Sequence, residues 1–243
     1  MSSPGRLIGV GTGPGDPELL TVKAVKAIET ADVVAYFAKR GRAGNGRAIV
    51  AHLLNDEKTL LPLYYPVTTE IEKADAAYRT QITAFYDQSA DAVADHLENG
   101  RTVAVLSEGD PLFYGSYMHL HVRLATRYST EVIPGISAMS GCWSLAGIPI
   151  VQGDDVLSVL PGTMAEGELE RRLSDTQAAV IMKVGRNLAK IRRALQASGR
   201  LAEAVYVERG TMANGAMTKL ADRPGDDAPY FSLILVPGWE ARR

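Results

Sequence analysis

The apolar residues of this chain fall into two kinds of segment. Short, almost continuous apolar runs, bounded by glycine, proline or acidic residues, alternate with longer segments in which apolar residues recur every three or four positions. The first pattern is typical of strands buried on both faces of a sheet, and the second is typical of amphipathic helices. Their alternation predicts an α/β fold.

In the first part of the chain, the two patterns follow each other regularly. The expected strands are residues 6–11, 32–36, 59–61, 103–106 and 130–133, and the expected helices are residues 22–30, 48–54, 69–99 and 116–128. Thr69 and Glu72 have the spacing of a capping box, so the longest helix should begin there and end before Gly100. Strands separated by helices indicate a mostly parallel sheet.

The pattern changes near residue 138. The expected strands are now residues 155–160, 178–183, 204–208 and 230–236, and the expected helices are 138–146, 165–174 and 187–198. No helix is expected between the last two strands, and consecutive strands without a crossover helix usually pair antiparallel. We therefore expect two α/β domains: residues 1–138 with a mostly parallel sheet, and residues 139–243 with a mixed one.

The composition narrows the class of protein. Hydrophobic residues make up 46% of the chain and charged residues 22%, and no apolar run is long enough to cross a bilayer. The single cysteine, Cys142, fits a reducing compartment, and the N-terminus shows no apolar export signal. A net charge of −2 argues against nucleic-acid binding. We expect a cytoplasmic protein that acts on a small molecule, without a nucleic-acid or membrane partner.

The glycine-rich segment after the first strand does not match the dinucleotide-binding fingerprint. In the pattern Gly-x-Gly-x-x-Gly, the sixth position holds Pro14 when counted from Gly9 and Asp16 when counted from Gly11. Prolines also remove N–H donors and an aspartate adds negative charge, and both features oppose phosphate binding. Binding of a nicotinamide cofactor is therefore not expected.

A second candidate loop follows the apolar run at residues 103–106. Glu108-Gly109-Asp110-Pro111 contains residues that favour turns, and it follows a buried strand at the end where open α/β sheets bind ligands. Asp110 could bind ligand hydroxyls or backbone N–H groups, or it could only stabilise the turn. The sequence leaves both roles open.

Four motifs stand in a fixed order along the chain. They are residues 10–17 (VGTGPGDP), 108–111 (EGDP), 132–138 (VIPGISA) and 183–187 (KVGRN). Together they resemble the tetrapyrrole (corrin and sirohaem) methyltransferases, over nearly the whole chain. Within that family, the likeness is greatest to the members that methylate precorrin-2 at C20 in cobalamin biosynthesis. The points of similarity are residues 64–70 (YYPVTTE), 113–121 (FYGSYMHLH), 206–212 (YVERGTM) and 229–232 (PYFS).

The resemblance implies a homodimer of class III, tetrapyrrole methylase-like subunits, with S-adenosyl-L-methionine bound in the cleft between the two domains. Matched motif by motif, the implied cofactor contacts are Pro14, Glu108, Gly109, Asp110, Phe113, Ser137, Ala138, Val184 and Gly215. Two positions depart from the family pattern. Glu108 stands where relatives often have a second glycine. Val184 stands where they often have methionine, with Met182 two residues earlier on the same expected strand face.

A tetrapyrrole precursor brings many carboxylates, which require local positive charge. The basic loop, residues 39–47, could supply that charge, as could arginines beside strand ends, and tyrosines could lie against the flat macrocycle. The candidate substrate contacts are Arg40, Arg42, Tyr114, Tyr117 and Arg209, with Arg186 as a further cation. A solvated surface loop and core packing of the tyrosines are the competing interpretations.

The chemistry implied by the family demands little acid–base catalysis. A sulfonium methyl group is already activated and a meso carbon of a reduced tetrapyrrole is electron-rich, so neither a catalytic triad nor a metal is expected, and no catalytic residue is assigned. The histidines are expected to have packing or surface roles. Two alternatives remain: the cobalt-containing precursor (cobalt-factor II) or another ring position as the substrate, and a non-catalytic tetrapyrrole-binding protein.

Overall fold

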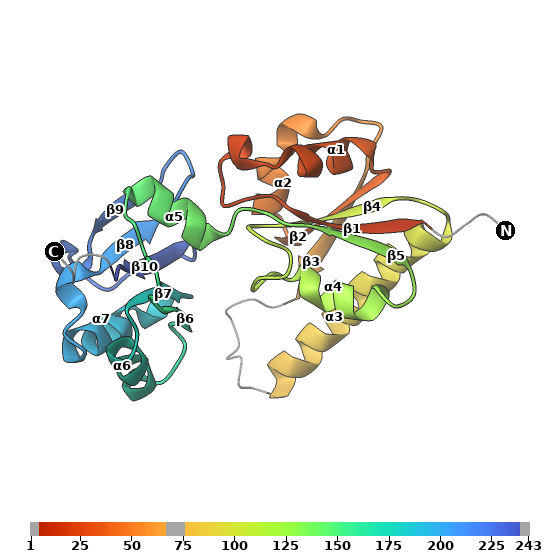
Figure 1. Cartoon of the computed structure of the whole chain (residues 1–243). Helices are drawn as coiled ribbons and strands as arrows, with labels where there is room; N and C mark the ends of the chain where they lie inside the picture. The colour runs from red at the N-terminus through yellow and green to blue at the C-terminus, as the bar shows by residue number, and fades with distance from the viewer. Residues whose placement is uncertain (1–4, 67–75, 239–243) are drawn as a thin grey trace. The chain divides into compact units, whose positions relative to one another are not determined.

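The structure is a computed structural model that describes residues 5–66 and 76–238 (Figure 1). Contacts between residues divide the chain into two compact units, Met1–Ser137 and Ala138–Arg243. The domain boundary expected after residue 138 lies one residue from this division. Each unit contains one five-stranded sheet with helices on both of its faces.

Every strand of the N-terminal sheet runs parallel to its neighbours. The strands are β1 (Arg6–Gly11), β2 (Val33–Lys39), β3 (Thr59–Tyr65), β4 (Val103–Ser107) and β5 (Ser129–Ile133), in the spatial order β3-β2-β4-β1-β5. Helices connect the successive strands, because a parallel pair needs a crossover that returns the chain to the same edge. The predicted parallel sheet is confirmed.

Helices cover both faces of this sheet. α1 (Val22–Thr30) and α2 (Asn45–Ile49) pack on one face, and α3 (Ala76–Glu98) and α4 (Tyr117–Leu124) pack on the other (Figure 1). Successive residues of a strand serve opposite faces: in β1, Leu7 packs with α3 and α4, and Ile8 packs with α1. Burial on both faces is the reason that these strands are continuous apolar runs in the sequence.

Two predicted elements of this unit have different bounds in the structure. β3 continues through Pro62 to Tyr65, because β3 lies at the sheet edge and the missing proline N–H group is tolerated there. The helix expected at residues 48–54 consists of α2 and a separate 3-10 helix, Ala51–Leu53.

The two long predicted helices are also adjusted. α4 ends at Leu124, and residues 125–128 form turns rather than the last part of the helix. α3 is described from Ala76 onward, and the proposed capping box at Thr69 and Glu72 lies outside the described residues.

The C-terminal sheet is mixed, as predicted. Its strands are β6 (Leu157–Pro161), β7 (Ala178–Met182), β8 (Val205–Glu208), β9 (Ala216–Lys219) and β10 (Ser232–Val236), in the order β6-β7-β10-β8-β9. β6 and β7 are parallel, and the other pairs are antiparallel, including the expected pair β8 and β10. β9 was missed because most of its residues are exposed at the sheet edge, so it shows no apolar alternation.

Helices again lie on both faces. α5 (Ala138–Ala146) covers one face, and α6 (Glu166–Ser174) and α7 (Leu188–Ala197) cover the other (Figure 1). Cys142 of α5 is buried in the core, as expected, and burial raises the pKa of its thiol to about 12. Further 3-10 helices are Pro17–Leu19, Gly185–Asn187, Leu201–Glu203 and Leu220–Asp222. None of the helices in the described ranges is long and apolar enough to cross a membrane.

Candidate functional site

Backbone hydrogen bonds join the loops that follow β1 and β4. The N–H group of Gly109 donates to the carbonyl of Gly13 at 2.8 Å, and the N–H group of Gly13 donates to the carbonyl of Gly109 at 3.3 Å. Thr12 is fully buried, and both its backbone N–H group and its hydroxyl donate to the carbonyl of Ser107. The two loops are therefore held together as one structure.

The carboxylate of Asp110 extends this structure to the loop that follows β5. Its Oδ1 accepts a hydrogen bond from the N–H group of Leu112 at 2.9 Å, and its Oδ2 accepts one from the N–H group of Gly135 at 3.2 Å. The first bond is that of an Asx turn. The second is a bridge between two strand ends, which the sequence did not predict. Direct binding of a ligand by Asp110 stays a prediction.

Glycine allows these loops to lie so close together. A Cβ atom added to Gly135 would lie 2.0 Å from the carbonyl oxygen of Gly109, and a Cβ atom added to Gly11 would lie 2.5 Å from the nitrogen of Gly135. No side chain fits at such distances, so the backbones touch directly. Close backbone approach is thus the reason for a glycine-rich segment that lacks the dinucleotide spacing.

The joined loops lie where the connections of the sheet diverge. β1 and β4 are neighbours, yet the chain leaves β1 for α1 on one face and leaves β4 for α4 on the other. Open α/β sheets bind their ligands at the carboxyl ends of strands at such switch points. Five of the predicted cofactor contacts lie in these two loops: Pro14, Glu108, Gly109, Asp110 and Phe113. Ser137 and Ala138 follow the third loop, where α5 begins.

Glu108 has a partner that its sequence position did not reveal. Its carboxylate accepts hydrogen bonds from the N–H group of Gly46 and from the side chain of Asn45, at the start of α2. Desolvation raises the pKa of Glu108, and these two hydrogen bonds oppose the rise, although the residue as a whole is exposed. Glu108 therefore connects the loop after β4 to the last residues of the basic loop, Asn45 and Gly46.

Backbone conformation marks four further positions. Among the described residues other than glycine, positive φ values occur at Tyr114 (54°), Lys183 (57°), Arg209 (47°) and Thr211 (68°). This conformation costs a residue with a side chain about 1–3 kcal/mol, and it clusters at functional sites. Each of these residues follows the carboxyl end of a strand, β4, β7 or β8. Strain therefore singles out the same loops as the sequence motifs do, and by an independent observation.

Val184 lies in the core of the C-terminal unit. Its side chain is fully buried with α6 and α7, so any cofactor contact would have to come from its backbone, and that contact stays a prediction. Met182 packs on the opposite face of the sheet, with the core that contains α5. The expectation that both residues share one face was wrong because Lys183 between them has a left-handed conformation, which interrupts the alternation of the strand.

The loop after β8 is closed around a glycine. The N–H group of Gly215 donates to the carbonyl of Met212 at 2.9 Å, and a Cβ atom at Gly215 would lie 2.6 Å from the carbonyl oxygen of Arg209. Within this loop, the hydroxyl of Thr211 is buried, and no described residue forms a hydrogen bond with it. An unpaired buried hydroxyl costs about 1–3 kcal/mol, a cost that a bound ligand with a polar group removes.

Tyr117 is a core residue and not a surface for the macrocycle. It is fully buried, and a Cβ atom at Gly9 of β1 would lie 2.3 Å from its ring. Its hydroxyl lies 3.2 Å from Nδ1 of His121, and burial raises its pKa to about 12. The packing alternative thus describes Tyr117. Tyr114, in contrast, is 46% exposed, with its ring edge-on to that of Phe113 at 4.8 Å.

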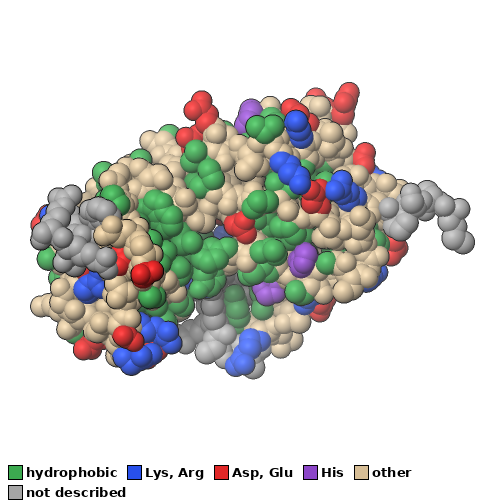
Figure 2. Space-filling model, viewed as in Figure 1, with side chains coloured by type: hydrophobic (Ala, Val, Ile, Leu, Met, Phe, Trp, Pro, Cys, Tyr) green, Lys and Arg blue, Asp and Glu red, His purple; other side chains and the backbone are tan. Residues whose placement is uncertain are grey.

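The predicted arginines have different surroundings. Arg40 and Arg42 are exposed, and the guanidinium of Arg40 lies 5.8 Å from the ring centre of Tyr64. Arg209 forms an ion pair with Glu208, so part of its charge is already neutralised. Charged side chains of both signs are scattered over the face of the molecule seen in Figure 2. A substrate role for Arg40 and Arg42 stays a prediction.

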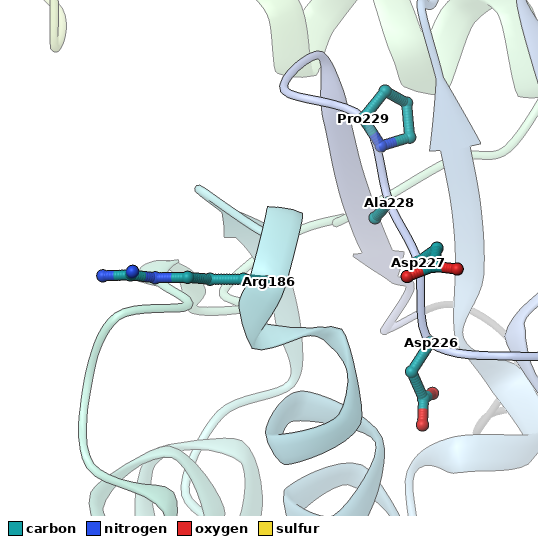
Figure 3. A pocket seen from close by; sticks show the side chains of 5 residues that line it. All are labelled: Arg186, Asp226, Asp227, Ala228 and Pro229. Carbon is teal, nitrogen blue, oxygen red and sulfur yellow. The ribbon is translucent and has the colours of Figure 1, made fainter. Parts of the chain in front are cut away.

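One open pocket of the C-terminal unit has a volume of about 430 Å³. Arg186 and residues 226–229 line it, and in the view of Figure 3 the side chain of Arg186 extends away from that segment. Asp226 is paired with Arg192 at 3.0 Å. Two aspartates beside Arg186 make this pocket unfavourable for a substrate with many carboxylates.

The described residues contain no group of three or more His, Cys, Asp and Glu side chains that could hold a metal ion. Two of the histidines contact neighbouring side chains: His119 stacks on Tyr86 with 3.9 Å between ring centres, and Nδ1 of His96 lies 3.2 Å from the guanidinium of Arg101. These are contacts of packing and of hydrogen bonding.

Comparison with known proteins decides the family. The model of the tetrapyrrole (corrin/porphyrin) methylases matches residues 6–221. The chain belongs to this family. A precorrin-2 C(20)-methyltransferase from Sinorhizobium sp is 78% identical over 238 residues, which are 98% of this chain and 97% of that protein. A cobalt-precorrin-2 C(20)-methyltransferase from Salmonella typhimurium is 27% identical over 97% of this chain and 98% of that protein.

Solved structures confirm the fold of this tetrapyrrole methylase. The uroporphyrin-III C-methyl transferase from Thermus thermophilus, complexed with S-adenyl homocysteine, matches with a TM-score of 0.64 and 21% identity. The match covers 98% of this chain and all of that one. At that identity the likeness shows a shared fold, with a parallel sheet followed by a mixed one.

Proposed function

We propose that this tetrapyrrole methylase transfers a methyl group from S-adenosyl-L-methionine to C20 of precorrin-2, giving precorrin-3A in cobalamin biosynthesis. The observation that carries the proposal is its 78% identity with the Sinorhizobium precorrin-2 C(20)-methyltransferase across almost the whole of both chains. Such identity leaves few positions at which a substrate site could differ. The metal-free precursor is favoured over the cobalt-containing one, because the relative named for the cobalt form is only 27% identical.

Features of both units fit S-adenosyl-L-methionine. The joined loops after β1 and β4, with Gly13, Gly109 and Asp110, present backbone at the switch point of the parallel sheet, where ligands of such sheets bind. Thr211 holds a buried hydroxyl that lacks a partner among the described residues and suits a polar group of the cofactor. When bound, S-adenosyl-L-methionine supplies a methyl group that its sulfonium has already activated.

The residues of this chain then have mainly to orient the substrate and exclude water. Holding two reactants in line can supply about 7–11 kcal/mol of a barrier. A meso carbon of a reduced tetrapyrrole is nucleophilic by itself, so no base is needed before the methyl group is transferred. A proton leaves the methylated carbon only afterwards, so a base is needed after the methyl transfer and not before it. We further propose a cytoplasmic homodimer, as the family implies, which sedimentation velocity tests directly.

The decisive experiment is incubation of the purified protein with S-adenosyl-L-methionine and precorrin-2, followed by mass spectrometry and NMR assignment of the methylated carbon. We expect one methyl group at C20, and much slower methylation of the cobalt-containing precursor. Calorimetry should show binding of S-adenosylhomocysteine and none of NAD. Methylation at another carbon would overturn the proposed position, and binding without turnover would favour a tetrapyrrole-binding protein.

A further inference from the structure

Three hydroxyl groups meet at the start of α4, beside the joined loops. Oγ of Ser116 forms hydrogen bonds with the hydroxyl of Tyr65, the last residue of β3, and with the hydroxyl of Tyr86 in α3, the latter at 3.1 Å. We call Tyr65, Tyr86 and Ser116 the hydroxyl cluster. Its members come from three elements, so only the folded structure brings them together.

The hydroxyl of Ser116 is used between elements and does not cap the helix. Ser116 directly precedes α4 and has helical backbone angles, φ −68° and ψ −23°, whereas a capping serine has an extended backbone. Its side chain forms no capping hydrogen bond. The hydroxyl has one proton and two lone pairs, which can serve both phenols. Ser116 therefore connects the start of α4 to β3 and α3.

Aromatic packing fixes both phenols in place. The ring of Tyr65 lies 5.7 Å from that of Phe37 and 4.9 Å from that of Phe85. Tyr86 is buried, and its ring stacks on His119 at 3.9 Å. Rings held from several sides keep their hydroxyls in fixed positions. Ser116 is thus anchored at two points that do not move with the loop itself.

The anchored serine lies next to the strained turn that holds Tyr114. Only Gly115 separates the two residues, and a Cβ atom at Gly115 would lie 2.6 Å from Oγ of Ser107. A left-handed tyrosine persists only where its surroundings hold it. The hydroxyl cluster fixes one end of this turn, and the close contact with Ser107 fixes its middle. Both contacts restrict the backbone of the turn that carries the exposed ring of Tyr114.

We propose that Ser116, Tyr65 and Tyr86 are positioning residues for the tetrapyrrole, and that they act through Tyr114, whose ring lies against the macrocycle. The inference rests on the proposed function, because it assigns the substrate-orienting residues of that same enzyme. An exposed aromatic ring offers a flat apolar face to a flat conjugated ligand. Arg40, stacked over the neighbouring Tyr64, provides positive charge at the end of β3 for a substrate carboxylate.

Single substitutions in the full chain remove each hydroxyl and keep the rings. In Ser116→Ala, we expect the KM for precorrin-2 to rise about tenfold, as the loss of two hydrogen bonds predicts. Tyr65→Phe and Tyr86→Phe should each raise the KM for precorrin-2 by less than tenfold. Ser116→Thr keeps a hydroxyl, so its KM should stay close to that of the wild type. The affinity for S-adenosylhomocysteine should stay within about twofold, because none of these three hydroxyls takes part in the backbone hydrogen bonds between Gly13 and Gly109 that join the loops.

A double-mutant cycle tests whether the cluster acts through Tyr114. Tyr114→Gly suits the positive φ and removes the ring, so it should also raise the KM. If Ser116 acts only through Tyr114, Ser116→Ala should have no further effect on the KM in the Tyr114→Gly protein. Fully additive effects would overturn the proposal.

Tyr128→Phe is the matched control. It removes a phenolic hydrogen bond to Glu98, of 2.9 Å, directly before β5 at the amino edge of the sheet. Its melting temperature should fall about as much as that of the cluster variants, with kinetics unchanged. A lower melting temperature and an unchanged KM in Ser116→Ala would reduce the cluster to a structural role and overturn the proposal. If the wild-type protein does not methylate precorrin-2 at all, the proposed function fails, which is a distinct result.

Discussion

The two units form their strand-end loops by different chemistry. Where the loops after β1 and β4 join, the left-handed positions are occupied by Gly13 and Gly109, with φ of 74° and 66°, and Tyr114 is a strained residue farther along the loop after β4. After β7 and β8, three left-handed positions are occupied by Lys183, Arg209 and Thr211, whose side chains make the same conformation costly. The joined part of the N-terminal loops is thus relaxed and closely packed, whereas the C-terminal loops store strain. The difference indicates that the side chains at these C-terminal positions have a role that outweighs the cost of their conformation, because glycine would adopt it without that cost.

The largest expected effect comes from filling the contact between the N-terminal loops. In Gly135→Ala, the new Cβ atom would lie 2.0 Å from the carbonyl oxygen of Gly109, so the loops must separate. We expect the free energy of unfolding to fall by about 3 kcal/mol, at the upper end for overpacking, and binding of S-adenosylhomocysteine to be lost. Urea denaturation and calorimetry measure the two effects.

Gly167→Ala is the control for this substitution. Gly167 lies in α6, and its added Cβ atom would meet nothing within 4 Å. Alanine should stabilise the helix by up to about 1 kcal/mol. A Gly135→Ala protein as stable as the wild type would show that the N-terminal loops are not held in close contact.

The next effect concerns the bridge made by Asp110. Asp110→Ala removes acceptors for the N–H groups of Leu112 and Gly135, and we expect a loss of about 1–3 kcal/mol in the free energy of unfolding. Asp16→Ala removes one comparable local bond, to the N–H group of Glu18, and serves as the control. The difference in free energy of unfolding between the two variants measures the contribution of the hydrogen bond from Gly135 to Asp110. If both variants lose the same stability, Asp110 acts only as a turn residue.

A smaller effect separates strain from function in the C-terminal unit. Thr211→Ala removes the unpaired hydroxyl and keeps the positive φ, whereas Thr211→Gly also relieves the strain. We expect the glycine variant to be about 1 kcal/mol more stable than the alanine variant, from the cost of a left-handed residue. Both should bind S-adenosylhomocysteine more weakly than the wild type. Unchanged affinity in both would separate the strained loop from the cofactor.

The smallest effect is expected at the surface of the N-terminal unit. Replacing both Arg40 and Arg42 with Gln should raise the KM for precorrin-2 by about tenfold and make it less sensitive to salt, because two exposed charge pairs contribute about 0–2 kcal/mol together. Cofactor affinity should not change. The kinetics are best measured at low ionic strength, where screening is weakest. A KM that does not move there would make the basic loop ordinary solvated surface.

Much of the fold could be predicted because its signals are local. A strand buried on both faces is a continuous apolar run, as at Val103–Ser107, and an amphipathic helix repeats its apolar residues at the helical period. β9 is not predicted because an exposed edge strand shows neither a continuous apolar run nor a helical period. The prediction for β3 is too short because Pro62 usually ends a strand, although an edge strand accepts a proline.

The candidate site could be predicted only as a set of loops. The motifs located the segments after β1, β4, β5, β7 and β8, and their glycines predicted turns there. The sequence did not predict the surroundings of single side chains. Tyr117 and Val184 proved to be buried, and Glu108 proved to contact Asn45, because each depends on residues that are distant in sequence or on the direction of the chain.

The sequence by itself determined the layered α/β architecture, the mixed character of the second sheet and the motifs of the family, because periodicity and motif are properties of neighbouring residues. Only the tertiary structure decided which motif residues face solvent. One left-handed residue, Lys183, placed Met182 and Val184 on opposite faces. Likewise, Ser116 meets Tyr65 and Tyr86 only after three elements have packed together. A rotation at one φ or a contact across elements leaves no pattern along the chain, and for that physical reason the sequence could not show it.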